Sequence, residues 1–464
     1  MHDWLAVRAA QDPSRLCLVA DSHRVSFAEL DEQVARAAGA LVKFGVKDGS
    51  RVAVWGAHDL ATVRAMWAVP RAGAVLLPIN TRLTKREASH QVIDAAVSLV
   101  LGHGDQPALG VPSLDLGEVA DGVPYRAGPP HADSPHSIVY TSGSSGNPKG
   151  VILTWANLEA AAGASAEVLE HGRKDVWLAV MPLYHVGGMS ILIRSARQGG
   201  AVVLDPFEPN RVATHLREGG ITLVSLVPTM LARVMDVDPG PFPDLRAVLL
   251  GAGPAPDSLL ARAAAGRVPV LSTYGLTEAA SQVATVPLAA ALARHKVVKP
   301  VPGMEVRIVD ERSEEVPPST SGSIQIRGAA VSPGYLHDRE RLPGTWFTTG
   351  DLGRMDADHN LEVLGRADDT IITGGEKVHP VEVEAAIQDH PEVVEVAVHG
   401  VEDPDWGQVV AATVVAPGVD GQSLDQFLRS RLAGFKVPTR WNFVSSIART
   451  SLGKIDRSRL RLPD

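Results

Sequence analysis

Short apolar runs alternate with longer amphipathic stretches from the start of the chain to about residue 350. The runs have the length and character of strands, whereas stretches such as 27–44 and 211–218 show the helical spacing of apolar residues. Alternation of this kind predicts an α/β domain built on largely parallel sheets. The expected strands lie at 51–55, 74–79, 137–140, 176–181, 201–204, 223–227, 247–250 and 268–271.

The pattern changes beyond residue 300. Residues 303–334 combine short strand patterns with turn residues, as in a small β-subdomain. A boundary is expected near 365–369, followed by a compact α+β unit of about a hundred residues, which is enough for a core of its own. Its predicted elements are helix 380–388, strands 393–399 and 409–415, helix 424–432 and strand 441–444. The predicted fold is therefore α/β, with a large N-terminal domain (1–367) of layered mixed sheets and helices plus the β-subdomain, and a small α+β C-terminal domain (368–464).

Residues 176–193 are a candidate membrane span, because they carry no full charge. Its middle contains Pro182, Gly187 and Gly188, which would interrupt a helix. The backbone N–H and C=O groups freed by that interruption would find no hydrogen-bond partners in lipid. We therefore predict a buried strand, a tight loop and the start of a helix there. The first thirty residues hold several charges and no apolar block of the signal-peptide kind, so a soluble protein with no membrane partner is expected.

Charge and cysteine content exclude several classes of protein. The chain has 44 basic and 53 acidic residues, a net charge of −9, which argues against a general nucleic-acid binder. Cys17 is the only cysteine, so neither an internal disulfide nor a four-cysteine zinc site can form. A reducing, cytoplasmic location is expected. The sequence leaves open whether the protein forms a homo-oligomer.

A loop rich in glycine and hydroxyl groups follows the predicted strand 137–140. Residues 141–150 read Thr-Ser-Gly-Ser-Ser-Gly-Asn-Pro-Lys-Gly. Glycines let backbone N–H groups approach an anion closely, and Lys149 adds a positive charge. The spacing differs from that of the common P-loop. Glycine and serine content alone favours a flexible surface turn, but this ordered string after a strand favours a phosphate-binding loop.

Four further segments complete an ordered set of motifs with this loop. They are 274–278 (Tyr-Gly-Leu-Thr-Glu), 349–351 (Thr-Gly-Asp), 365–384 and 449–457. Together they resemble the motifs of the adenylate-forming enzymes, which include acyl- and aryl-CoA ligases, amino-acid adenylation domains and luciferases. The resemblance covers essentially the whole chain. It implies that a carboxylate attacks the α-phosphate of ATP, that Mg²⁺ assists, and that coenzyme A then takes the acyl group as co-substrate. Such catalysis depends mostly on positioning and electrostatics.

The resemblance also implies roles for residues around the nucleotide. The phosphate-contact residues would be Thr141, Ser142, Gly143, Ser144 and Lys149. Thr277 would contact the α-phosphate, and Glu278 would hold Mg²⁺, an ion that prefers oxygen ligands. The alternative for Glu278 is a charge that satisfies a helix N-terminus.

The ribose and the adenine have their own expected partners. By the same resemblance, Asp351 would accept hydrogen bonds from both ribose hydroxyls with the help of Arg366; the alternative is a turn aspartate and a surface ion pair. The adenine would be lined by the backbone of Gly251, Ala252 and Gly253, with Tyr274 stacked on it. Many family members have glycine where this chain has Ala252.

Lys454 is the expected catalytic lysine. A surface lysine near a C-terminus is ordinarily only solvated, but its context, Gly-Lys-Ile-x-Arg, resembles the family's lysine motif. The resemblance implies that Lys454 neutralises charge during adenylation and that the mobile C-terminal domain then rotates about a hinge at Asp368. Gly374 and Gly375 would then lie beside the pantetheine channel. The nucleophile is the thiol of coenzyme A, so Cys17 is not needed.

The acid itself is set by pocket residues rather than by the motifs. The expected substrate contacts are His185, which is also a candidate catalytic residue, Ser190, Arg233, Ser281 and Gln282. Each has a structural alternative: a histidine packed in the core, a helix-capping serine or an exposed arginine. A wall of His185 and small residues fits an aromatic acid. The short length of the chain and the sequence of residues 401–408 resemble those of the CoA ligases that act on one aromatic keto-diacid. The second carboxylate of that substrate would contact the Ser281–Gln282 edge or Arg233.

Three rival functions stay open. A medium-chain fatty acid or 4-coumarate-type CoA ligase would have an apolar pocket without a carboxylate partner. A stand-alone amino-acid adenylation enzyme would use an aspartate for the substrate ammonium, and residues 178–193 contain no acidic residue. A catalytically silent protein on the same fold is disfavoured by the joint presence of Thr277, Glu278, Asp351 and Lys454.

Overall fold

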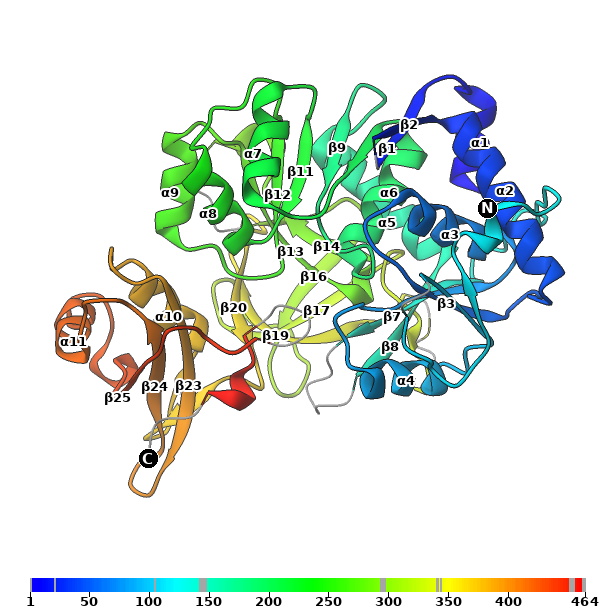
Figure 1. Cartoon of the computed structure of the whole chain (residues 1–464). Coiled ribbons are helices and arrows are strands. Elements are labelled where there is room, and N and C mark those ends of the chain that lie inside the picture. The colour runs from blue at the N-terminus through cyan, green and yellow to red at the C-terminus, as the bar shows by residue number, and fades with distance from the viewer. Residues whose placement is uncertain are drawn as a thin grey trace.

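The computed structural model describes residues 2–20, 22–103, 106–141, 148–292, 298–338, 342, 344–449 and 455–460. Figure 1 shows a large body and, at one side, a smaller unit formed by the last hundred residues or so. Four of the predicted site residues, Ser142, Gly143, Ser144 and Lys454, lie outside the described residues.

Two large sheets organise the N-terminal body, and both are parallel at their centres with antiparallel strands at an edge. In the described chain the first sheet has nine strands in the order β15-β14-β13-β12-β11-β9-β10-β1-β2, and the second has seven in the order β18-β8-β7-β4-β3-β5-β6. The first comprises β1 Leu16–Ala20, β2 His23–Ser26, β9 Val176–Ala179, β10 Ala201–Leu204, β11 Leu223–Leu226, β12 Ala247–Leu250, β13 Val270–Leu276, β14 Ser281–Thr285 and β15 Lys299–Pro300. The second comprises β3 Arg51–Trp55, β4 Val75–Pro78, β5 Leu99–Gly102, β6 Ser113–Asp115, β7 Pro135–Thr141, β8 Lys149–Thr154 and β18 Gly334–Tyr335. The predicted α/β class with largely parallel sheets is confirmed.

Helices fill the space between the sheets and cover their outer faces. The helices of the body are α1 Trp4–Gln11, α2 Phe27–Lys43, α3 Leu60–Arg71, α4 Lys85–Asp94, α5 Trp155–Leu169, α6 Val186–Gln198, α7 Pro209–Glu218, α8 Pro228–Val237 and α9 Asp257–Ala265. The largest core cluster joins α1, α2, α3, α5 and α6 to strands of both sheets. A second cluster packs α7, α8 and α9 on the other face of the first sheet, and a third packs α4 on the second sheet. The body is thus layered as helix, sheet, helix, sheet, helix.

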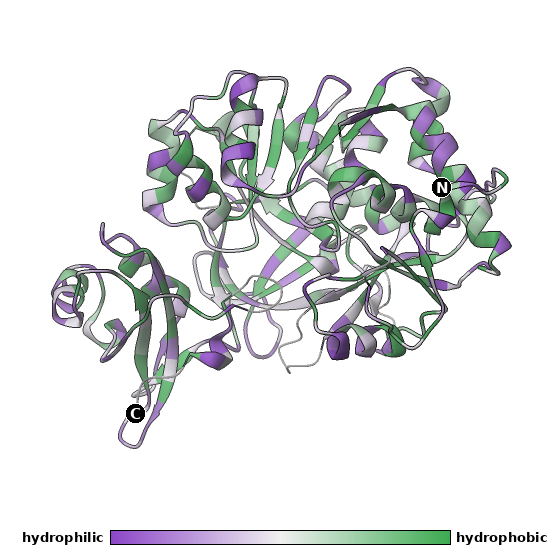
Figure 2. Cartoon of the chain, in the orientation of Figure 1, coloured by the Kyte–Doolittle hydropathy of each residue, from purple (hydrophilic) through white to green (hydrophobic). Residues whose placement is uncertain are grey.

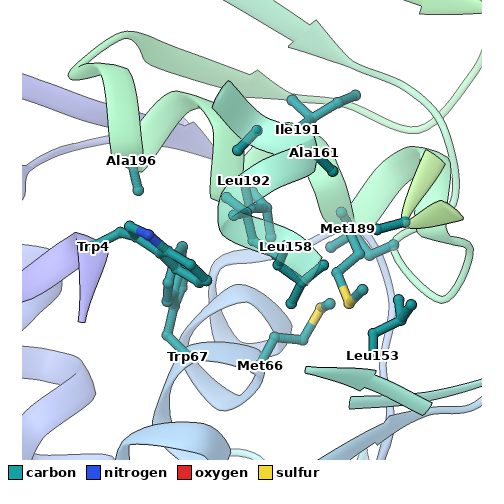
Figure 3. Packing of buried hydrophobic residues seen from close by; sticks show 14 of the residues in the cluster. Trp4, Met66, Trp67, Leu153, Leu158, Ala161, Met189, Ile191, Leu192 and Ala196 are labelled. Carbon is teal, nitrogen blue, oxygen red and sulfur yellow. The ribbon is translucent and has the colours of Figure 1, made fainter. Parts of the chain in front are cut away.

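The central layer is held by apolar side chains of both sheets and the helices between them. Figure 3 shows Trp4, Trp67, Met66, Leu158 and Met189 converging from different helices. Burial of such side chains is the main stabilising contribution to the fold. Figure 2 shows the strands largely green, with purple confined mostly to outer helices and loops, as this layering requires.

The uncharged stretch 176–193 forms the elements that the sequence predicts. Strand β9 is followed by a loop and then by α6, which begins directly after His185. Glycines and Pro182 therefore fall at the strand-to-helix connection. Within the described chain no helix is both long and apolar enough to cross a membrane.

The β-subdomain and the C-terminal unit follow. In the described residues, β16 Met304–Val309, β17 Gly322–Gly328, β19 Phe347–Met355 and β20 Leu361–Arg366 form an antiparallel sheet. The last unit contains β21 Ile371–Thr373, β22 Glu376–Val378, α10 Pro380–Gln388, β23 Glu395–Asp403, β24 Gly407–Val415, α11 Gly421–Arg429 and β25 Arg440–Phe443. Its core cluster uses only residues from 371 onward, and the described members of the larger clusters end at 363. We therefore propose the predicted domain boundary, 367/368, within this interval.

Three predicted elements are displaced. The strand expected at 393–399 is β23, which begins two residues later and runs on to Asp403 in its antiparallel pairing with β24. The strand expected at 268–271 is β13, which runs further, to Leu276. Arg267 has a positive φ of 54° and turns the chain after α9, and pairing with β14 then extends the strand. The helix expected at 424–432 is α11, which starts three residues earlier because Asp420 caps it through the Ser423 N–H.

Two fully buried histidines make the folded state sensitive to acid. His136 lies between Trp4 and Trp155, and His171 packs edge-on to Trp177. No ring nitrogen of either histidine has a hydrogen-bond partner among the described residues. Burial lowers the pKa of His136 to about 3 and that of His171 to about 4.

We expect the free energy of unfolding to fall as the pH drops below about 6.5. In that range the unfolded chain binds protons that these folded histidines do not, so each contributes a loss of up to about 1.4 kcal/mol per pH unit. Denaturant melts between pH 7 and 5 measure the slope, and His136→Gln is expected to make it shallower. An identical slope in the variant would contradict the assignment to His136.

Candidate active site

The phosphate-contact loop connects the antiparallel strands β7 and β8. Their last register pair before the loop is Thr141 opposite Lys149. Thr141 is half-buried and Lys149 is exposed, so both ends of the loop place polar groups at the same edge of the sheet. The sequence prediction that the loop follows a buried strand is confirmed.

Glu278 lies in a short turn after β13, within reach of the same edge. Its Oε1 accepts a hydrogen bond of 2.8 Å from the Tyr335 hydroxyl, and the Lys149 ammonium lies 5.1 Å from the centroid of that tyrosine ring. Thr277 precedes Glu278 and is half-buried. The structure therefore brings Lys149 close to the adjacent residues Thr277 and Glu278, which lie more than a hundred positions further along the sequence. Glu278 lies in the first turn of a 3₁₀ helix of three residues, Thr277–Ala279, so the helix-terminus alternative stays open.

A second polar group gathers around Asp351 on β19. Tyr274 donates from its hydroxyl to Asp351 Oδ2 at 2.6 Å, and Arg366 Nη1 donates to Asp351 Oδ1 at 3.2 Å. Arg366 Nη1 also donates to the Thr349 carbonyl at 3.1 Å. Burial, together with the neighbouring Asp351 charge, raises the pKa of Tyr274, so its phenol stays protonated as a donor. Arg366 reaches Asp351 because β19 and β20 pair these two residues directly.

The expected adenine loop follows β12. Gly251 is half-buried, and Ala252 and Gly253 are exposed. Ala252 has a φ of +64°, a left-handed conformation that glycine adopts freely and that costs other residues about 1–2 kcal/mol. The structure thus gives a physical reason why a glycine is the more favourable residue at this position.

The predicted substrate residues are not all placed alike. His185 precedes α6, is half-buried and packs edge-on against Tyr184. Ser190 is buried inside α6 and its hydroxyl donates to the Gly187 carbonyl, so it does not cap the helix as the alternative expected. Arg233 is exposed and lies over the Phe207 ring, as in the exposed-arginine alternative.

The Ser281–Gln282 edge lies directly beyond Glu278 on β14. Ser281 has a φ of +123°, an unusual conformation for any residue other than glycine. Gln282 is buried, donates from Nε2 to Thr285 Oγ1 at 2.9 Å, and has no partner for its Oε1 among the described residues. A strained backbone beside a buried polar side chain is typical of a functional site.

The described residues that flank Lys454 contact one another and the C-terminal unit. Arg449 pairs with Ile455 in a β-bridge, and the Asp456 N–H donates to the Ala448 carbonyl at 2.9 Å. Arg457 forms ion pairs with Glu384 at 2.7 Å and with Asp369 at 3.2 Å. These contacts join the lysine segment to the residue that follows the expected hinge, Asp368.

Gly374 and Gly375 form the turn between β21 and β22, both with positive φ. A Cβ on Gly374 would meet the Trp406 ring at 2.6 Å, whereas a Cβ on Gly375 would meet no heavy atom within 4 Å. Trp406 is itself largely exposed. The two adjacent glycines therefore have different reasons to lack a side chain.

Comparison with known proteins identifies the family. Residues 5–336 match the model of the AMP-binding enzyme family, and residues 382–454 match the AMP-binding enzyme C-terminal domain. The chain belongs to the AMP-binding enzyme family. The predicted resemblance to the adenylate-forming enzymes is thus confirmed.

Individual relatives of this AMP-binding enzyme cover its whole length. A 2-succinylbenzoate–CoA ligase from Bacillus licheniformis is 36% identical over 99% of this chain and 99% of its own. The o-succinylbenzoate CoA synthetase (MenE) from Bacillus subtilis, in complex with the acyl-adenylate intermediate OSB-AMP, is 30% identical over 100% of this chain and 99% of its own, with a TM-score of 0.94. A double mutant of that synthetase bound with its product analogue OSB-NCoA covers 99% and 98% at 30% identity, with a TM-score of 0.77.

The site contains one polar residue that the motif analysis did not single out. Tyr335 contacts Glu278 and Lys149, and a signal for it was available in the turn sequence Ser-Pro-Gly-Tyr at 332–335.

Proposed function

We propose that this protein is an ATP-dependent acid–CoA ligase that acts on o-succinylbenzoate in menaquinone biosynthesis. The observation that carries the proposal is the assembly of Lys149, Thr277, Glu278, Tyr274 and Asp351 into one site, on a chain whose full-length relatives are named 2-succinylbenzoate–CoA ligases. o-Succinylbenzoate is the aromatic keto-diacid that the pocket residues favour.

The first half-reaction makes a better leaving group. A substrate carboxylate oxygen attacks the α-phosphorus of ATP, the bond to the β-phosphate oxygen breaks, and pyrophosphate leaves. The 141–149 loop holds the β- and γ-phosphates, Thr277 contacts the α-phosphate, and Lys454 neutralises the charge that develops. Asp351 holds the ribose, with Tyr274 and Arg366 fixing its carboxylate, and Gly251–Gly253 line the adenine. Preorganised charges of this kind supply most of the rate enhancement.

Mg²⁺ fits the donor set around Glu278. The carboxylate is half-buried, one of its oxygens is held by Tyr335, and a threonine hydroxyl adjoins it, all hard oxygen groups of the kind this ion prefers. Glu278 would hold the ion, which supplies charge neutralisation on the phosphates.

The second half-reaction needs another face of the C-terminal domain. The thiolate of coenzyme A attacks the acyl carbonyl carbon, and AMP leaves with the pair of electrons of the broken C–O bond. We propose that the domain turns at Asp368 and brings Gly374 and Gly375 to the pantetheine. The TM-scores support this: the present arrangement matches the OSB-AMP complex better than the OSB-NCoA complex.

The acid pocket is proposed to be lined by His185 and the Ser281–Gln282 edge, which would meet the second carboxylate directly or through water. Ser190 and Arg233 are weaker proposals, because their polar groups have partners of their own. We also propose a cytoplasmic location, which fits a single, buried cysteine.

The test is an acid panel with two readouts. Purified protein, ATP, Mg²⁺ and CoA are incubated with o-succinylbenzoate, benzoate, 4-coumarate or octanoate, and both AMP and free thiol are measured. We expect AMP release and thiol consumption in equal amounts with o-succinylbenzoate and little with the others. Turnover of octanoate or coumarate instead would favour the rival ligases, AMP release without thiol loss would favour an adenylation enzyme, and no AMP with any acid would reject the function.

A further inference from the structure

Tyr335 lies between the two opposite charges of the site. Its hydroxyl donates to Glu278 Oε1 at 2.8 Å, and the Lys149 ammonium lies over the face of its ring, 5.1 Å from the centroid. A phenol group offers a hydrogen-bond donor at its edge and an electron-rich face for a cation. One side chain thus contacts both the carboxylate and the ammonium.

The backbone around Tyr335 is tied to the elements that carry these charges. Strand β18 pairs with β8 through Tyr335 and Val151, and the Leu336 N–H donates to the Gly150 carbonyl at 2.8 Å. The Ser332 N–H donates to the Glu278 carbonyl at 2.7 Å. Residues 332–336, which we name the tyrosine strap, therefore connect the strand that begins at Lys149 to the turn that holds Glu278.

The start of the tyrosine strap is anchored to the central helix layer. Asn157 donates from Nδ2 to the carbonyls of Ala329 and Val331 at 2.9 and 3.0 Å. Asn157 is buried and also completes the capping box of α5 with Thr154. A strap fixed in this way can hold a side chain in one orientation before any ligand binds, which is what preorganised catalysis requires.

We propose that Tyr335 is a positioning residue for adenylation: its hydroxyl orients Glu278 toward the magnesium of Mg·ATP, and its ring keeps Lys149 from pairing with that carboxylate. This inference rests on the proposed function. An ammonium and a carboxylate on adjoining elements attract each other, and a direct ion pair would compete with Mg²⁺ and phosphate for the same two groups. Tyr335 leaves both charges available to the nucleotide.

Tyr335→Phe tests the hydroxyl with a readout that needs no turnover. Calorimetric ATP binding is measured with and without Mg²⁺ and in the absence of any acid. We expect the Kd for ATP with Mg²⁺ to rise about tenfold, because a hydrogen bond to a charged group is lost, and the Kd without Mg²⁺ to change far less. Half-saturating Mg²⁺ in pyrophosphate exchange should rise in parallel. Tyr335→Leu, which also removes the ring, should have the larger effect.

Tyr140→Phe is the matched control. The Tyr140 hydroxyl donates to Asp94 Oδ2 at 2.5 Å, a tyrosine–carboxylate bond of the same kind in the same sheet that does not involve Glu278. This variant should keep the wild-type Mg²⁺ dependence. The inference is wrong if Tyr335→Phe binds Mg·ATP like the wild type, or if it weakens ATP binding equally with and without Mg²⁺, which is the signature of a merely structural role.

A double-mutant cycle gives an independent decision. With Glu278→Gln in place, adding Tyr335→Phe should cause no further loss of Mg²⁺-dependent ATP binding, whereas additive losses would overturn the coupling. Failure of the proposed function is distinguishable, because absence of exchange with every acid would reject the ligase while the binding experiment still decides the role of Tyr335.

Discussion

Replacing Lys454 with alanine is expected to slow adenylate formation by about 10²–10³-fold while leaving ATP binding nearly unchanged. In the proposed function the ammonium acts while charge develops between the carboxylate and the α-phosphate, whereas Asp351, Glu278 and the phosphate-contact loop would hold the nucleotide before the reaction. An interaction made only in the transition state lowers the rate without lowering ground-state affinity. Acid-dependent pyrophosphate exchange measures the rate, and calorimetry measures ATP binding.

The described residues that flank Lys454 are anchored to the C-terminal unit. Arg449 and Ile455 form a β-bridge with each other, and Arg449 pairs with Glu395. Arg457 forms ion pairs with Asp369 and Glu384. Lys174→Ala is a suitable control, because that lysine is exposed between α5 and β9. An exchange rate unaffected by Lys454→Ala would show that this lysine has no catalytic role.

Local sequence patterns predicted most of the central strands. Strands β3, β10 and β12 and helix α10 have the predicted bounds, since each is a short apolar run or an amphipathic segment with clear flanking turns. Strands β8 and β14 were not predicted. Each is paired as a hairpin partner to a neighbouring strand, and this non-local pairing, rather than local composition, decides its conformation.

The motifs predicted which residues would form the candidate nucleotide site, because nucleotide chemistry demands fixed residue types. Asp351 and Tyr274 were expected to serve the same nucleoside, and their side chains do meet. The geometry that produces this contact, a β13 end facing β19, could not be derived from spacing alone. The contact of Arg366 with Asp351 depends likewise on the β19–β20 register.

The acid pocket was less predictable than the nucleotide site. Ser190 and Arg233 have the right chemistry for a substrate contact but are engaged elsewhere. The Ser190 hydroxyl donates a hydrogen bond within α6, and the Arg233 guanidinium lies over the Phe207 ring. Ser281 is notable for its backbone, whose positive φ no composition rule would have indicated. Pocket shape arises from such tertiary details, which is why motif chemistry identifies the reaction more readily than the acid.

Gly375→Trp is expected to block thioester formation and to spare adenylate formation. In the present arrangement a Cβ at Gly375 would meet no heavy atom within 4 Å, so a side chain can leave the backbone there without a clash. If the domain then turns about Asp368, the indole would occupy the path of the pantetheine and slow the second half-reaction by at least about 100-fold. Gly374 is unsuitable for this test, because a side chain there would collide with Trp406.

A matched substitution separates this blockage from the cost of backbone strain. Gly375 has a φ of +86°, so any other residue there destabilises the turn by about 1–2 kcal/mol. Gly418 has a φ of +90° and an equally open surrounding, but it lies in the loop between β24 and α11. Gly418→Trp should therefore carry the same strain and retain both half-reactions.

Pyrophosphate exchange reports the first half-reaction, and single-turnover transfer from the isolated adenylate to CoA reports the second. Equal loss of both half-reactions in Gly375→Trp would contradict domain alternation, because a residue that acts in only one arrangement can affect only the step performed in it.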